Sequence, residues 1–198
     1  MTPDLSRAFP ADPADLRRLH EKLAAAAERD GLLDVAYRVV DSPVGPLLLA
    51  ATGQGLVRVA YEGEGHDAVL QALADRVSPR ILRDPARLEP AARELGEYFE
   101  GRRRAFGLAL DWRLVSGFRG AVLRQLPGIG YGRTASYAAI AQLTGSPRAV
   151  RAVGTACATN PLPVVVPCHR VVRSDGSLGG YLGGAEAKRA LLDLEAAA

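Results

Sequence analysis

The chain has 198 residues, 48% of them hydrophobic, so it can form one large or two small globular domains with a substantial core. No apolar run approaches the ~18 residues of a membrane span, and the N-terminus carries acids early with no apolar signal core. We therefore expect a cytoplasmic protein with no membrane contact. Its two cysteines, Cys157 and Cys168, are then expected to be reduced.

The net charge of +3 is unevenly distributed. Residues 1–100 hold 12 basic and 17 acidic side chains, whereas residues 101–198 hold 13 and 5. A basic half is typical of a surface that meets an anion such as nucleic acid. Drift in surface composition would give the same split, so the charge alone decides nothing.

Residues 1–33 are predicted to be a helical appendage, with a helix over 15–29 whose apolar face carries Leu16, Leu19, Leu23 and Ala26. Residues 34–112 are predicted to form a small α+β domain, because short apolar runs separated by turns indicate a β-meander. The expected strands span 36–41, 47–51, 56–61 and 106–112, and the expected helices span 67–77 and 89–99.

Residues 113–198 are predicted to form a helical domain, with helices over 118–126, 136–143, 148–157 and 187–194. A glycine turn at 144–146, followed by Pro147 in the first position of the next helix, gives a helix-turn-helix pattern. That next helix is rich in small residues and places Arg148 and Arg151 on one face. Such a helix can lie close to its own core or to a nucleic-acid groove.

The stretch 164–172 carries the strongest chemical signal. The β-branched residues 164–166 predict a buried strand that Pro167 ends. Cys168 and His169 follow at once, and a thiol beside a base is a candidate nucleophile because the thiolate is the reactive form. A packed core histidine is the ordinary alternative for His169.

With its neighbours in the sequence, this stretch resembles the O6-alkylguanine–DNA alkyltransferases, also called methylated-DNA–protein-cysteine methyltransferases. The resemblance runs from about residue 35 to 195. It is carried in register by Asp41-Ser42-Pro43-x-Gly45, Tyr131-Gly132, Thr134-x-Ser136-Tyr137, Arg151-Ala152-Val153-Gly154, Asn160-Pro161, Pro167-Cys168-His169-Arg170-Val171 and Gly180-Tyr181-x-Gly183-Gly184.

The resemblance implies an α+β fold, in which a small ribonuclease-H-like α/β domain precedes a winged-helix or helix-turn-helix-like domain for DNA binding and catalysis. It implies an enzyme that acts once, a methylated-DNA–[protein]-cysteine S-methyltransferase. It would flip the damaged base from the minor groove of double-stranded DNA and move an alkyl group to Cys168 from guanine O6, or less readily from thymine O4. No cofactor and no metal are expected. We expect a monomer, with cooperative assembly on DNA left open.

The resemblance also implies roles for individual residues. Cys168, His169 and Glu195 would form a Glu–water–His–Cys relay, with Asn160 as a brace to the helix-turn-helix. DNA binding and base flipping would use Tyr137, Arg148, Arg151, Ala152 and Gly154. The pocket for the flipped base would be formed by Tyr137, Val171, Tyr181, Leu182 and Gly183.

The chain also departs from the family pattern. Leu182 stands where some relatives have a serine that reaches the substrate oxygen, and Gly130 stands where proline is usual. Arg119 and Leu123 stand where Gln and Trp are common, and the first 33 residues have no clear counterpart.

Three other functions compete with the enzyme. A non-enzymatic sensor of alkylated DNA would lack the nucleophile, which Cys168 supplies here. A helix-turn-helix regulator would not need the Cys-His stretch. A thiol or metal site formed by Cys157, Cys168 and His169 is one ligand short of a structural metal site.

Overall fold

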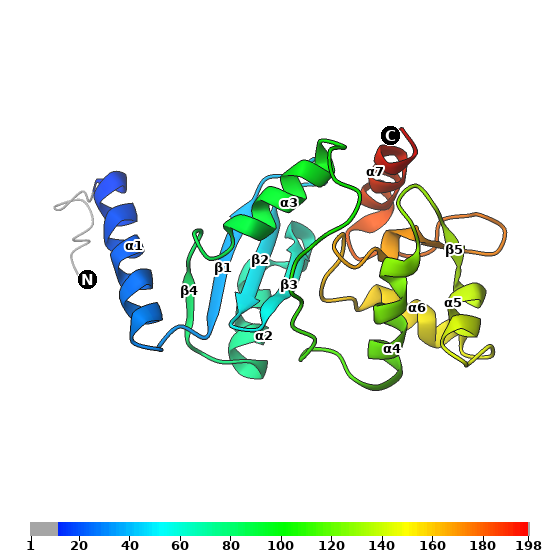
Figure 1. The fold of residues 1–198 in the computed structure, drawn as a ribbon, viewed down its shortest axis with the longest axis horizontal. Coiled ribbons are helices and arrows are strands. Elements are labelled where there is room, and N and C mark those ends of the chain that lie inside the picture. The colour runs from blue at the N-terminus through cyan, green and yellow to red at the C-terminus, as the bar shows by residue number, and fades with distance from the viewer. Residues whose placement is uncertain (1–11, 198) are drawn as a thin grey trace, which may run out of the picture.

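The computed structural model describes residues 12–197 as a sheet-containing N-terminal part followed by a helical C-terminal part (Figure 1). The sheet has the order β3-β2-β1-β4, with β1 antiparallel to β2, β2 antiparallel to β3, and β1 parallel to β4. The strands of this sheet are β1 (Val35–Val40), β2 (Leu47–Thr52), β3 (Gly55–Tyr61) and β4 (Ile81–Arg83). The helices are α1 (Pro13–Arg29), α2 (His66–Arg76), α3 (Glu89–Phe99), α4 (Gly117–Gln125), α5 (Tyr137–Leu143), α6 (Val150–Ala158) and α7 (Gly184–Ala196).

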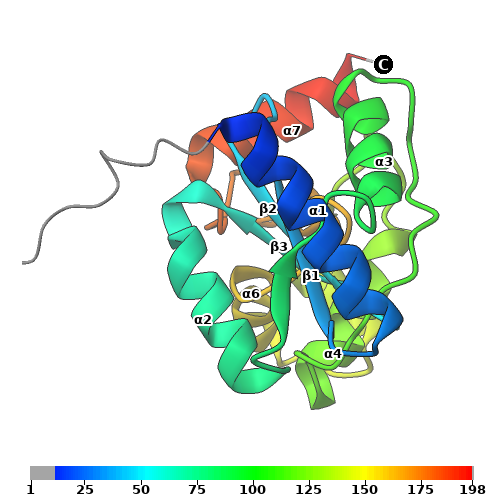
Figure 2. The ribbon, with the colours of Figure 1, turned by 90° about the vertical axis from the view of Figure 1, so that its left-hand side faces the viewer.

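The sheet buries both faces because successive side chains on a strand point in opposite directions. On β2, Leu47 and Leu49 belong to the same core as α3, whereas Leu48 and Ala50 pack in a second core with α2. Figure 2 shows the sheet between these two helices. The α3-side core continues into the C-terminal part, so the two parts share one hydrophobic core.

The C-terminal part joins the helix-turn-helix to the cysteine segment. The turn between α5 and α6 contains Gly145, whose φ of +69° favours glycine. Just before α5, the short strand β5 (Ala135–Ser136) pairs in parallel with β6 (Val171–Val172), which follows the cysteine. This pairing brings the start of α5 close to the Cys168 segment.

The predicted helices of both parts are present, with ends shifted by up to three residues and α3 over the predicted range. One predicted strand is wrong: in segment 106–112 only Leu110 makes a bridge, to Leu56. A side chain replaces a strand as the hydrogen-bond partner in this segment, since the amide of Gly107 donates to the Glu94 carboxylate at 2.8 Å. The fourth strand of the sheet is β4, which was not predicted.

The first helix leaves its leucine face exposed. The side chains of Leu16, Leu19 and Leu23 are each more than half exposed, whereas Ala24 and Ala27 are buried. The alanine face allows α1 to lie against β4, where the ring of His20 is hydrogen-bonded to the carbonyl of Arg83 at 2.8 Å. Residues 1–11 of the predicted appendage lie outside the described residues.

Residues 164–166 are buried as predicted, but they form turns and not a strand. Pro161 and Pro163 have no amide hydrogen to give a sheet, and Val164 has a φ of +71°. The amide of Val166 instead donates to the carbonyl of Leu162 at 2.8 Å. The prediction failed because a buried apolar run does not by itself specify backbone conformation.

The predicted start of α6 is wrong as well. The helix begins at Val150, so Pro147 and Arg148 lie in the preceding turn. Arg148 therefore does not share a helical face with Arg151. Within residues 12–197, no helix is long and apolar enough to cross a membrane.

Candidate active site

Cys168 begins a short 3₁₀ turn, Cys168–Arg170, at the centre of the C-terminal part, and only 1% of its surface is exposed. The Nδ2 of Asn160 lies 3.1 Å from its Sγ and also donates to the carbonyl of Val166 at 2.8 Å. The Oδ1 of Asn160 accepts from the amide of Leu162 at 3.0 Å. Asn160 thus connects the end of α6 to the thiol.

Burial raises the pKa of the Cys168 thiol to about 11, although the hydrogen bond from Asn160 and the charge of Lys188 both act to lower it. At neutral pH the resting thiol is therefore protonated. Lys188 is itself buried, its Nζ donates to the carbonyl of Val171 at 2.6 Å, and burial lowers its pKa.

His169 is buried beside the thiol in the sequence and contacts Glu195 directly. Its Nε2 lies 2.8 Å from Oε1 of Glu195, so these two side chains meet without a water between them, and a water between His169 and Cys168 stays a prediction. Burial lowers the pKa of His169, which is therefore neutral at pH 7. A neutral ring that donates from Nε2 has an unprotonated Nδ1, and Nδ1 is buried with no hydrogen-bond partner among the described residues.

Glu195 is the acceptor at the centre of a buried network. Its carboxylate accepts from Nε and Nη2 of Arg170 at 2.9 Å each, from the hydroxyl of Tyr98 at 2.7 Å, and from the amide of Gly132 at 3.1 Å. Burial alone would raise the pKa of Glu195, but the hydrogen bonds from His169 and Arg170 prevail and hold it at about 2. Glu195 itself lies in α7 and is buried.

Sequence reasoning missed two members of this network. Arg170 lies within the recognised motif, yet no role was expected for it, although its adjacency to His169 is a usable signal. Tyr98 comes from α3 in the N-terminal part, and no sequence pattern connects it to residue 195. Only the packing of the two parts brings its hydroxyl to the carboxylate.

A glycine-rich loop at 178–184 covers the site and is held by two tyrosines. The hydroxyl of Tyr181 lies 2.8 Å from that of Tyr61 on β3, and their rings meet edge to face at 5.8 Å. A Cβ on Gly183 would lie 2.6 Å from the Tyr61 ring, and one on Gly179 would lie 2.3 Å from the hydroxyl of Tyr137. The loop therefore fits only because these positions are glycine. Tyr61 was not predicted.

A shallow groove of about 270 Å³ runs beside this loop and α6. It brings together three of the predicted residues, Tyr137, Arg151 and Gly154, with Arg173, which was not predicted. Arg148 and Ala152 are exposed but do not line the groove, and Leu182 lines a different cleft. Val171 is buried behind the loop beside Cys168.

Among residues 12–197, no group of three or more His, Cys, Asp or Glu side chains is arranged to hold a metal ion. The neighbours of Cys168 are Asn160 and a backbone turn, which suit a nucleophile better than a metal ligand. Cys157 is buried on α6, and burial raises its pKa to about 12.

Two family models together match most of the chain. Residues 35–112 match the ribonuclease-like domain of 6-O-methylguanine DNA methyltransferase, and residues 117–197 match its DNA-binding domain. The chain therefore belongs to the 6-O-methylguanine DNA methyltransferase family, whose members are methylated-DNA–protein-cysteine methyltransferases.

Individual relatives agree with this assignment. The methylated-DNA–protein-cysteine methyltransferase of Mycobacterium tuberculosis is 40% identical over 81% of this chain and 92% of its own length. The inducible methyltransferase of Bacillus subtilis is 41% identical over 74% of this chain and 82% of its own length. A crystal structure of the M. tuberculosis protein in complex with DNA aligns with a TM-score of 0.71 at 39% identity, covering 82% of this chain and 93% of that one.

Proposed function

We propose that this chain repairs double-stranded DNA by moving a methyl or larger alkyl group from O6-alkylguanine, and less readily from O4-alkylthymine, to Cys168. The observation that carries the proposal is the buried thiol held by Asn160 beside the His169–Glu195 pair. A thiol beside a neutral base suits displacement at an alkyl carbon, because the thiolate is the nucleophile. The product is a thioether, and no neighbouring group could remove the alkyl, so each molecule acts once.

The proposed reaction balances as a displacement at the alkyl carbon. The Cys168 sulfur forms a bond to that carbon while the carbon–O6 bond breaks, and its electron pair passes to the guanine. The thiol proton moves to Nδ1 of His169 through a bridging water, and the resulting positive charge is stabilised by Glu195. The guanine takes up one proton, for which the hydroxyl of Tyr137 is the proposed donor, and the proton held by His169 then returns to Tyr137 through solvent, so that the thiol proton is in effect transferred to the guanine.

The target atom lies inside the duplex, so the base must be extruded at a cost of a few kcal/mol. We propose that α6 lies in the minor groove and that Arg151 enters the stack in place of the base. Tyr137, Gly154 and Arg151 share one groove, which supports a common surface for DNA. Arg148 and Ala152 are exposed, and we propose that they contact the DNA backbone.

The flipped base is proposed to lie between Tyr137 and the loop 178–184, with Val171 behind it and Tyr181, Leu182 and Gly183 as the covering residues. In the structure the loop lies directly on Tyr137 at Gly179, so the base can enter only if the loop moves. Leu182 offers no side-chain donor to the substrate oxygen, so only backbone amides of the loop could bind it.

We also propose that residues 1–33 are an appendage, that residues 34–112 form the N-terminal domain, and that residues 113–198 form the alkyltransferase and DNA-binding domain. The separate ranges of the two family models support these boundaries. The protein is proposed to act as a monomer. Cooperative assembly on DNA is a separate question that sedimentation on long duplexes would answer.

The test uses a duplex with an isotopically labelled methyl group on guanine O6. After incubation, peptide mass spectrometry locates the label. We expect one methyl per protein on the peptide that contains Cys168, with no further uptake at excess duplex. Repeated turnover, or label on Cys157, would contradict the proposal.

The matched control is Cys168→Ala, which is expected to bind the modified duplex and transfer nothing. The same assay addresses the alternative of a non-enzymatic sensor of alkylated DNA or a regulator. If the protein with its natural Cys168 binds the modified duplex but takes up no label, it is a sensor and not an enzyme.

A further inference from the structure

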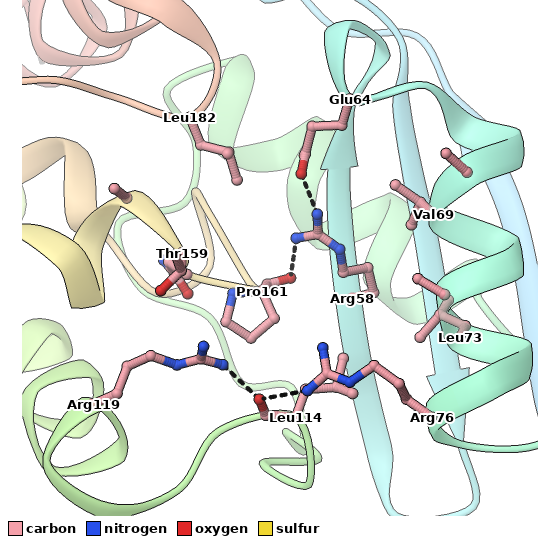
Figure 3. Close-up of a pocket in the computed structure, with 14 residues that line it drawn as sticks. Arg58, Glu64, Val69, Leu73, Arg76, Leu114, Arg119, Thr159, Pro161 and Leu182 are labelled. Atoms are coloured by element: carbon pink, nitrogen blue, oxygen red, sulfur yellow. Dashed lines mark hydrogen bonds and ion pairs between the residues drawn. The ribbon is translucent and has the colours of Figure 1, made fainter.

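A second cavity lies between the two parts of the molecule, behind the loop 178–184. This cleft has a volume of about 450 Å³. Figure 3 shows Arg58, Val69 and Leu73 of the N-terminal part on one side and Arg119 and Thr159 of the C-terminal part on the other. It is a different site from the groove with Arg151, although Ala158 at the end of α6 lines both.

The charges in this cleft are unbalanced. Arg58 is paired with Glu64, which is the one acidic residue among those lining the cleft. Arg76 and Arg119 form no ion pair with any described carboxylate and instead both point at one backbone oxygen. The Nη2 atoms of Arg119 and Arg76 lie 2.5 Å and 3.5 Å from the carbonyl of Leu114 (Figure 3). Two positive charges therefore converge without a counter-charge.

Arg119 is also incompletely bonded. Its Nε is buried and has no hydrogen-bond partner among the described residues. A buried donor without a partner costs free energy, and a guanidinium carries five donors in a fork that matches the oxygens of phosphate. Burial and the charge of Arg76 both lower the pKa of Arg119, and a bound anion would oppose both effects.

The rest of the cleft is apolar. Val69 and Leu73 line one wall, and Leu114, Pro161 and Leu182 line the others. The volume is within the usual range of ~300–1,000 Å³ for small-molecule sites. A ligand that fits carries a phosphate for the arginines and a nucleoside-sized body for the apolar walls.

We propose that this cleft binds a phosphate-bearing ligand of nucleotide size through Arg76 and Arg119. The ligand would be a free nucleotide or a nucleotide of a DNA strand that passes the end of α6. Its body contacts Leu182 in the covering loop, and the cleft also includes Asn160, which holds the Cys168 thiol. Binding of the ligand would therefore depend on the position of the covering loop and would in turn change it. Only the DNA source depends on the function proposed above.

The side-chain Nε–H signal of Arg119 in ¹H–¹⁵N NMR spectra gives a direct readout, assigned by its loss in Arg119→Gln. Inorganic phosphate, deoxyguanosine 5′-monophosphate and an undamaged duplex are titrated separately into the full chain at constant ionic strength, with chloride as the control anion. We expect a saturable shift with a phosphate-bearing probe and none with chloride.

The probes separate the two sources. Saturation by the mononucleotide identifies a free nucleotide. A shift by the duplex alone identifies a DNA phosphate, and Arg76→Gln/Arg119→Gln should then reduce the slope of log Kobs against log[salt] by about 0.9 for each phosphate that is no longer neutralised. No shift with any of the three probes would overturn the proposal, and neither outcome depends on alkyl transfer.

Arg76→Gln is the more informative single variant, since Arg76 is exposed and the fold should tolerate its loss. It is expected to weaken binding of the identified probe about tenfold, which equals about 1.4 kcal/mol. The control Arg83→Gln/Arg93→Gln removes two exposed charges from elsewhere on the N-terminal part. An equal loss of affinity in this control would mean that general charge, and not the cleft, attracts the anion.

Discussion

Cys168 is held as a neutral thiol in the resting protein, because burial raises its pKa to about 11. Next to it in the sequence, the neutral ring of His169 is hydrogen-bonded to the carboxylate of Glu195. A thiol that ionises only when a substrate is in place is protected from other electrophiles. We therefore expect activation of the thiol to require a substrate beside it.

Arg151 provides a test of base flipping at the level of one residue. Its side chain is exposed in the groove on α6, so Arg151→Ala should leave stability within ~0.5 kcal/mol. We expect slower transfer from O6-methylguanine in a duplex and an unchanged rate with the free base O6-methylguanine, which needs no flipping. Rate constants for both substrates check this. Equal slowing would place Arg151 in the chemical step.

Glu195→Gln tests the buried network. The substitution leaves Arg170 buried with no carboxylate partner, and breaking a buried pair in this way costs about 3–5 kcal/mol. We expect a large fall in the unfolding free energy, measured by chemical denaturation, together with slower transfer. Tyr98→Phe, which removes one hydrogen bond to the ionised carboxylate, should cost about 1.5–3 kcal/mol and serves for comparison.

At the scale of elements, α6 and the loop 178–184 depend on glycine for different reasons. A Cβ on Gly154 would meet no atom within 4 Å, so this glycine keeps the helix surface low where the groove is open. A Cβ on Gly183 would strike the Tyr61 ring, so that glycine allows contact between the loop and the N-terminal part. Gly154 therefore keeps the groove accessible, whereas Gly183 allows the loop to pack against Tyr61.

Gly154→Leu should separate DNA binding from folding. The new Cβ meets no atom within 4 Å, and leucine favours a helix more than glycine by up to about 1 kcal/mol, so Tm should not fall. Duplex affinity, measured by fluorescence anisotropy, should fall because the side chain projects into the groove. Gly154→Ala controls for helix propensity. Unchanged affinity in Gly154→Leu would remove α6 from the DNA interface.

Gly183→Ala should be destabilising and should slow alkyl transfer. Its φ of −81° is ordinary, so the effect comes from the clash with the Tyr61 ring at 2.6 Å, and such overpacking costs about 1–3 kcal/mol. Tyr61→Ala/Gly183→Ala should recover part of the loss, giving a non-zero coupling energy in a double-mutant cycle. Additive losses would mean that Tyr61 does not hold the loop.

At the scale of the whole molecule, the site is shared between the two parts. The N-terminal part contributes Tyr98 to the Glu195 network and Tyr61 to the covering loop. One core connects the parts, so we expect them to unfold together. The N-terminal part therefore acts in the site as a support for the histidine and the loop.

The titration of buried groups predicts how stability changes with pH. Above pH 9 the unfolded chain releases thiol protons that the folded chain keeps, because the pKa values of Cys157 and Cys168 rise to about 12 and about 11. Unfolding then releases protons, so the unfolding free energy should fall by about 1 kcal/mol per thiol between pH 8 and pH 10. Denaturation of the unmodified protein and of Cys157→Ala at both values checks this.

At acidic pH, the change in stability comes from groups whose pKa values are lowered in the folded chain. The folded pKa values of His169 and Glu195 are both lowered, so the unfolded chain binds protons that the folded chain does not. Stability should fall as pH drops below about 6.5, where unfolded histidine protonates, and further below 4.5, where unfolded glutamate does. A free energy that rises on acidification would contradict these assignments.

The local pattern of residues was sufficient to predict the helices and most of the sheet, and to select the candidate nucleophile, because periodicity and a contiguous motif are local properties. Cys168, His169, Asn160 and Glu195 were all chosen from the sequence, and the structure brings them together. Contacts between distant segments were not predictable. Tyr98 meets Glu195 across 97 positions, and Tyr61 meets Tyr181 across 120.

Tertiary packing also decided three local features. It turned the alanine face of α1 inward, kept residues 164–166 out of a sheet, and placed Leu182 in the interdomain cleft. Each depends on which neighbour is available to bury a side chain or to bind a backbone group, and propensity carries no information about that neighbour. The sequence by itself determined which side chains the candidate site contains, whereas the packing of the two parts decided their supporting groups and formed a second cavity.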